Sequence, residues 1–129
     1  VSWIAYSSCE SKIEVFNSNQ PRILIAKQVQ EYIEANFRET IHIEDPCRTT
    51  GKGVRTIQRC FRQYFDITIT DYIKMVRLNA AYKMLSTSHP EGKTVATVAL
   101  QKGFTHIGRF SVDYRKQFGE SARETLAKR

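Results

Sequence analysis

Apolar residues recur every three or four positions along most of this chain, which is the spacing of α-helices with one buried face. The first stretch covers residues 22–37, with its apolar positions at Ile23, Ala26, Val29, Ile33 and Phe37. Later stretches with the same spacing cover 41–50, 53–65, 68–86, 94–102, 106–118 and 121–128. The pattern predicts an all-α fold of about seven helices.

One part of the pattern occurs twice, with a register that shifts by one residue. Cys47 and Gly51 are echoed 52 positions later by Ala99 and Gly103. The apolar residues that follow are echoed 53 positions later: Ile57, Phe61 and Phe65 by Phe110, Tyr114 and Phe118. A small residue, a glycine four positions on and then a helical apolar stripe indicate helix, tight turn and second helix. The chain therefore predicts two helix-turn-helix units, whose second helices suit the major groove of DNA.

The second helix of the first unit has two different faces. Its buried stripe is expected to contain Ile57, Cys60, Phe61, Tyr64 and Phe65, and its opposite face carries Arg55, Arg59 and Arg62. The helix over 68–86 has apolar residues on two sides, so we expect it to connect two lobes. Capping patterns begin this helix and the last one, at Thr68 with Asp71 and at Ser121 with Glu124.

These features predict four segments. Residues 1–20, acidic by one charge and rich in Ser, Asn and Gln before Pro21, are expected to be a linker or the remnant of an upstream domain. Residues 21–67 form the first helix-turn-helix subdomain, 68–87 the connector helix and 88–129 the second subdomain. A loop is expected at 88–93, around Pro90 and Gly92.

Charge favours a polyanionic partner. The 129 residues include 20 Lys and Arg against 13 Asp and Glu, a formal net charge of +7, with an isoelectric point near 9.5. Charge alone would also fit RNA or a membrane surface. Between residues 48 and 62, however, no acid interrupts the basic residues Arg48, Lys52, Arg55, Arg59 and Arg62. In a helix-turn-helix frame this run indicates contact with DNA rather than a merely solvated face.

Other kinds of chemistry find little support. The three cysteines, Cys9, Cys47 and Cys60, contain no Cys-x-x-Cys pair, so neither a disulfide framework nor a zinc site is expected. No apolar run approaches the roughly 20 residues that cross a bilayer. Scattered histidines and no nucleophile beside a base leave no catalytic site to assign. We expect an intracellular protein that is not an enzyme and needs no cofactor.

The later helices carry a recognisable set of residues. They are Tyr72, Arg77, Leu78, Ala81 and Leu85, then Gly103, Phe104, Phe110, Phe118 and Gly119. From about Ile23 to Leu126 the chain resembles the AraC/XylS family of bacterial transcription regulators, and within it regulators of ethanolamine utilisation. The resemblance implies two helix-turn-helix lobes joined by a long helix, with double-stranded DNA and RNA polymerase as partners. It also implies activation of transcription in the bacterial cytoplasm at the nucleoid, and a separate domain for effector sensing and dimerisation.

The chain departs from the family pattern at Pro46, His42, Gly53 and Ala122. Pro46 lacks an N–H and disfavours a helical residue before it, so the first helix of the first unit is expected to begin late. Gly53 can cap a helix with a loss of stability of only roughly a few tenths of a kcal/mol relative to Ser or Thr.

Expected base contacts follow from side-chain chemistry and from the family positions. Arginine forks match guanine and a glutamine amide matches adenine, so Arg55, Gln58 and Arg59 are expected to read bases, with Arg62 on phosphate. The expected contacts in full are Arg55, Thr56, Gln58, Arg59 and Arg62, then His106, Ile107, Gly108, Arg109, Val112 and Arg115. Gly108 and Val112 replace two arginines of the first unit. We therefore expect the first unit to specify sequence and the second mainly to dock on phosphates.

The sequence favours a sequence-specific DNA-binding domain that places two recognition helices in adjacent major-groove segments. The alternative is a basic helical adaptor or RNA-binding module, in which the arginines meet acidic partners or an A-form backbone without reading sequence.

Overall fold

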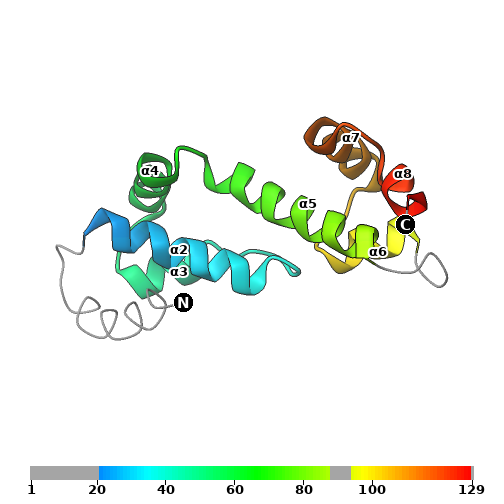
Figure 1. The fold of residues 1–129 in the computed structure, drawn as a ribbon. Helices are drawn as coiled ribbons and strands as arrows, with labels where there is room; N and C mark the ends of the chain where they lie inside the picture. Colours follow the sequence, from blue (N-terminus) through cyan, green and yellow to red (C-terminus); the bar gives the residue numbers. More distant parts are fainter. Residues whose placement is uncertain (1–20, 88–93, 129) are drawn as a thin grey trace. The chain divides into compact units, whose positions relative to one another are not determined.

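The computed structural model describes residues 21–87 and 94–128, so the expected linker at 1–20 and loop at 88–93 lie outside it. The described residues form seven helices, α2 to α8, and no strand, as the apolar pattern predicts (Figure 1). They divide into two compact units, one containing 21–35 and 41–71, the other 36–40 and the described residues after 71. Each unit has its own core.

The first unit is built from α2 (Arg22–Asn36), α3 (Glu44–Thr50) and α4 (Val54–Phe65). The inner face of α2 is fully buried at residues spaced by three and four. The buried face of α4 and the first residues of the following helix belong to the same unit. The buried apolar residues of this unit are Ile25, Ala26, Val29, Ile33, Ile57, Cys60, Phe61 and Ile69.

Local chemistry sets the limits of α3 and α4. Helix α3 begins at Glu44, later than the expected Ile41, and no side chain caps it. The late start is explained by Pro46, which tolerates only the first turn of a helix because it has no N–H to donate. Gly51 ends α3 with φ +73°, and Gly53 stands extended before α4. The predicted tight turn is thus confirmed, with glycine at the position that needs a left-handed backbone.

The expected buried stripe of α4 is confirmed at three of its five residues. Ile57, Cys60 and Phe61 are buried and Phe65 is half-buried, but Tyr64 is 45% exposed. Its ring meets the edge of Phe65 and lies 5.9 Å from the Lys27 ammonium, measured to the ring centroid. A tyrosine can cover apolar surface with its ring while its hydroxyl stays in water, so helical spacing alone overestimated its burial.

The second unit contains most of α5 (Ile69–Thr87), with α6 (Val95–Gln101), α7 (Ile107–Phe118) and α8 (Ala122–Ala127). One face of α5 supplies Leu78, Ala81 and Leu85 to a core whose other buried members are Val98, Ala99, Phe110, Tyr114 and Ala122. Thr94 caps α6 through a hydrogen bond from Thr97 N to its hydroxyl. The helices of the repeated pattern therefore bury equivalent apolar positions.

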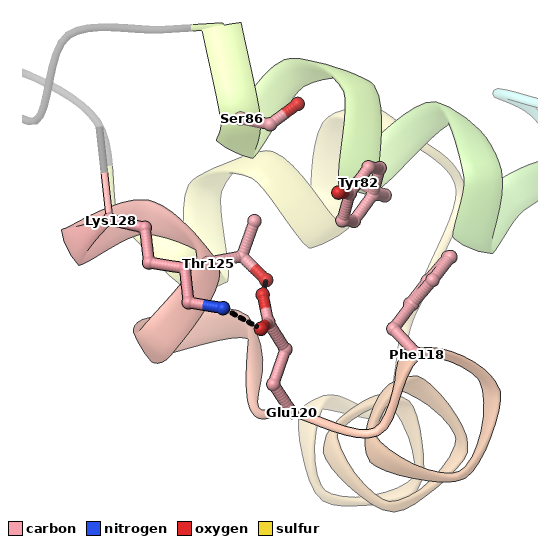
Figure 2. A pocket seen from close by; sticks show the side chains of 6 residues that line it. All are labelled: Tyr82, Ser86, Phe118, Glu120, Thr125 and Lys128. Carbon is pink, nitrogen blue, oxygen red and sulfur yellow. Dashed lines mark hydrogen bonds and ion pairs between the residues drawn. The ribbon is translucent and has the colours of Figure 1, made fainter.

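The last helix is fixed by polar contacts at its start and along its side. The predicted capping box is present: Ser121 and Glu124 each accept from the other's backbone N–H. The buried Tyr114 hydroxyl donates to Thr125 at 2.8 Å, and Thr125 donates in turn to Glu120. Lys128 donates to the same carboxylate at 2.5 Å (Figure 2). These bonds link the core of the second unit to its surface.

A half-buried arginine joins α5 to the segment that follows α2. Arg77 donates from Nε to the carbonyl of Phe37 at 2.8 Å and from a terminal nitrogen to that of Glu39 at 3.0 Å. Burial lowers the pKa of the guanidinium. Gly103, the turn glycine of the second unit, has φ +100° and lies against these groups. The turn of the second helix-turn-helix therefore packs against the residues just after α2.

Candidate nucleic-acid interface

Helix α4 presents a continuous exposed face. Its members are Arg55, Thr56, Gln58, Arg59 and Arg62, all of them solvent-exposed. The residues between them, Ile57, Cys60 and Phe61, are buried and hold the helix in the unit. All the expected contacts of the first unit are therefore brought to the open side of one helix.

The arginines on this face are not neutralised within the part of the chain that the structure describes. Arg55, Arg59 and Arg62 form no ion pair there, and α4 itself contains no acidic residue. Arg48 differs, because it forms an ion pair with Asp45 three residues before it. The positive charge of the basic run that is not balanced by an ion pair therefore lies on α4 more than on α3. The sequence alone did not reveal this difference.

Helix α7 presents the corresponding face of the second unit. Gly108, Arg109, Arg115 and the capping residue His106 are exposed, and Val112 is 57% exposed. Ile107 is half-buried and packs against the core of this unit. It faces the protein more than the other expected contacts do, so its predicted contact is the weakest of the set.

The two faces differ in chemistry although their helices are equivalent. Where α4 has Arg55 and Arg59, α7 has Gly108 and Val112 in the repeat register. Nothing lies within 4 Å of a β-carbon built on Gly108, so this position is open. The guanidinium forks of α4 can pair with guanine, whereas a valine offers only apolar contact to a thymine methyl.

Each recognition helix also contacts a basic side chain from the helix that precedes its helix-turn-helix pair. Arg22 of α2 donates to the Gln63 amide of α4 at 2.8 Å. Lys74 of α5 pairs with the Asp113 carboxylate of α7 at 3.6 Å. Neither contact was predicted from the sequence. A signal was present, because Arg22 and Lys74 stand 52 positions apart, which is the repeat offset before the turn glycine.

Other chemistry is weakly represented in the described residues. They contain no group of three or more His, Cys, Asp or Glu side chains that could hold a metal ion. No helix among them is long and apolar enough for a membrane span. Cys47 is half-buried, and burial raises the pKa of its thiol, which disfavours the reactive thiolate. A cavity of about 270 Å³ between α5 and α8 contains none of the expected contacts (Figure 2).

Two helix-turn-helix units, each with an exposed second helix and basic side chains, define a DNA-binding domain of the helix-turn-helix class. A family profile described as "Helix-turn-helix domain" matches residues 47–128. A probable AraC family transcriptional regulator from Rhodopseudomonas palustris has a similar solved structure, with 38% identity, a TM-score of 0.74, and coverage of 81% of this chain and 95% of that one. The chain belongs to the AraC/XylS family of transcription regulators.

Two further comparisons agree with this assignment. The XylDLEGF operon transcriptional activator 1 of Pseudomonas putida is 29% identical over 123 residues, which is 91% of this chain and 37% of that protein. The DNA-binding domain of AdpA, solved with a target DNA, shares the fold at 24% identity with a TM-score of 0.68, covering 81% and 90% of the two chains. The chain spans about a third of the length of the P. putida activator. The family consists of DNA-binding regulators, not enzymes.

Proposed function

We propose that the chain reads its operator unequally, with α4 selecting bases and α7 mainly docking on the DNA backbone. The observation that supports this is the difference between the two exposed faces. Arg55, Gln58 and Arg59 offer three side chains with donor or acceptor groups that match base edges. The equivalent stretch of α7 offers Gly108, Ser111 and Val112, which have fewer or none.

The remaining charges fit contacts with phosphates. Arg62 lies farther along α4 than the base-reading residues, and Arg115 is its equivalent on α7. Arg109 and His106 are exposed near the start of α7, where helix N-termini favour anions. Phosphate contacts set the register of a protein on the duplex without reading sequence. On one face of B-DNA, successive major-groove segments are about 34 Å apart, so two recognition helices would engage neighbouring segments.

We also propose that the chain is the DNA-binding part of an activator that contacts RNA polymerase at the bacterial nucleoid. The name of the P. putida relative, a transcriptional activator, supports this role. Effector sensing and dimerisation are assigned to a further domain, in line with the family resemblance. The narrower resemblance to ethanolamine-utilisation regulators stays a prediction.

Selection of bound duplexes from a random pool tests the proposal directly. The expected result is a two-part site in which the part under α4 has sharply preferred bases and the part under α7 has weak preferences. Binding should survive excess nonspecific duplex, because specific affinity exceeds nonspecific affinity typically by about 10³ or more. Sharper preference under α7 would contradict the asymmetric assignment. Binding that is lost to competitor, or that favours RNA, would support the basic adaptor or RNA-binding alternative.

A further inference from the structure

Arg22 and Lys74, which contact the two recognition helices, occupy equivalent positions of the internal repeat. The offset that relates Arg22 to Lys74 also relates Ala26 to Leu78 and Ile33 to Leu85, which are buried core residues of α2 and α5. Helices α2 and α5 therefore serve the two units in the same way. Each places a basic side chain against its own recognition helix, although the two recognition helices supply different acceptors.

The acceptors stand about one turn apart in the repeat register. Gln63 corresponds to Lys116 of α7, whereas Asp113 corresponds to Cys60 of α4, a buried core position. The Asp113 side chain is only 13% exposed, while Lys74 remains 41% exposed. An acid thus occupies an inward position of α7, directly after the exposed Val112. Its charge is balanced from α5 by Lys74.

We propose that Lys74 is a positioning residue that fixes α7 through Asp113, and that Arg22 does the same for α4 through Gln63. This inference rests on the proposed use of α4 and α7 as the DNA-contacting helices. Neither basic residue belongs to the contacts assigned above. Each acts through a side chain of the recognition helix.

The polar contacts from α2 and α5 add a directional restraint on the recognition helices that the apolar core does not provide. Burial of Phe110 and Tyr114 holds α7 against its unit, but the hydrophobic effect has no direction. A polar contact from a neighbouring helix limits how far the recognition helix can rotate about its axis or slide along it. Binding groups must be held within about 0.5 Å and 10–20° to be productive, so a small rotation weakens base and phosphate contacts. The Arg22–Gln63 hydrogen bond is exposed and contributes little to stability, so its loss should leave the fold intact. Loss of Lys74 leaves the mostly buried Asp113 carboxylate without its partner and should lower the stability of the second unit as well.

Reciprocal variants test the proposal on duplexes that carry base changes under one unit at a time. Lys74→Met should weaken specific binding about fivefold, a loss typical of one charge pair, and reduce footprint protection only under the second unit. Arg22→Met should do so only under the first unit. Lys83→Met is the matched control, because Lys83 is an exposed lysine of α5 outside every ion pair described here. It should leave both protections unchanged.

Asp113→Leu separates positioning from charge, because leucine, unlike asparagine, offers Lys74 no acceptor. If Asp113 only repels phosphates, removing its charge will strengthen binding; if it positions α7, the specific affinity will fall. Combining Lys74→Asp with Asp113→Lys should restore the footprint lost in Lys74→Met. Equal losses under both units, or losses no larger than any seen in Lys83→Met, would overturn the inference.

Hydrogen exchange of the free protein provides a measurement independent of DNA. Lys74→Met should speed exchange in α7 but not α4, and Arg22→Met should speed it in α4 but not α7; confinement to one helix distinguishes this effect from a global loss of stability. Unaltered exchange in both variants would contradict positioning even if DNA binding is weakened. Failure of the wild-type chain to prefer any duplex would instead contradict the proposed function.

Discussion

The α-hydrogen side of Gly103 faces the carbonyl oxygen of Phe37 so closely that a β-carbon built there would lie 2.5 Å from that oxygen. The same oxygen accepts the hydrogen bond from Arg77. Because the obstructing atom belongs to the backbone, it cannot move aside as a flexible side chain can. The turn of the second helix-turn-helix is therefore fitted directly to the segment after α2.

Gly103→Ala should lower the free energy of unfolding by roughly 2–4 kcal/mol, combining left-handed backbone strain with damage to a charge-assisted hydrogen bond. Gly51→Ala is the matched control, because Gly51 has φ +73° but no atom within 4 Å of the added β-carbon. It should cost only about 1–2 kcal/mol, from strain alone. Urea unfolding of both variants measures the difference. Equal losses would show that contact with Phe37 adds nothing.

Arg59→Ala should relax base preference under α4, with a loss of about 1–3 kcal/mol of discrimination if the guanidinium makes a bidentate base contact. Val112→Ala should have little effect, because an apolar contact discriminates less. Binding measured against a panel of single-base variants of the selected site compares the two. A larger loss of preference in Val112→Ala would reverse the roles assigned to the two helices.

The C-terminal caps of the recognition helices predict a stabilising change. Both helices end on a left-handed residue, Asp66 with φ 59° after α4 and its repeat equivalent Gly119 with φ 76° after α7. Glycine adopts this conformation without steric cost, and an acid beside the negative end of a helix dipole is unfavourable. Asp66→Gly should raise the free energy of unfolding by about 0.5–1 kcal/mol. Gly119→Asp should lower it, and an unchanged melting temperature in both variants would contradict this reading.

Acid should loosen α8. The Ser121 backbone N–H lowers the pKa of Glu124, and the hydrogen bond from Lys128 lowers the pKa of Glu120. A lowered folded-state pKa means stabilisation that is present above the ordinary value of 4.5 and lost as pH falls below it. Melting temperatures between pH 6 and 3 should fall less steeply in the variant carrying Glu120→Gln and Glu124→Gln. A curve parallel to that of the wild type would contradict this assignment.

Most of the fold was predictable because it depends on local spacing. The apolar period and the glycines at 51 and 103 indicated every described helix to within a few residues, and the Ser121 capping box was predicted as observed. Burial at helix ends was less predictable. Tyr64 satisfies the period of α4 but lies exposed near its end, since periodicity cannot tell whether a neighbour covers the last turn.

The exposed faces were predictable from the sequence, but the contacts that hold them were not. Arg55 and Arg59 stand opposite an apolar stripe, so their exposure follows from helical geometry. The pairing of Arg22 with Gln63, 41 positions away, depends on how α2 packs against α4 in three dimensions. Arg77 was recognised in the sequence only as part of a family signature. Its bonds to two backbone carbonyls became clear only in the structure.

The free space beside Gly108 means that a side chain can be gained at this position during evolution. Single substitutions at Gly108 and Val112 alter the surface that α7 is proposed to offer to DNA without disturbing the core beneath the helix, since Gly108 has free space and Val112 is exposed. Mutations that give α7 a preference for new bases therefore need no compensating changes to keep the domain folded. Duplicated regulators could acquire different target genes by this route while retaining the first unit unchanged.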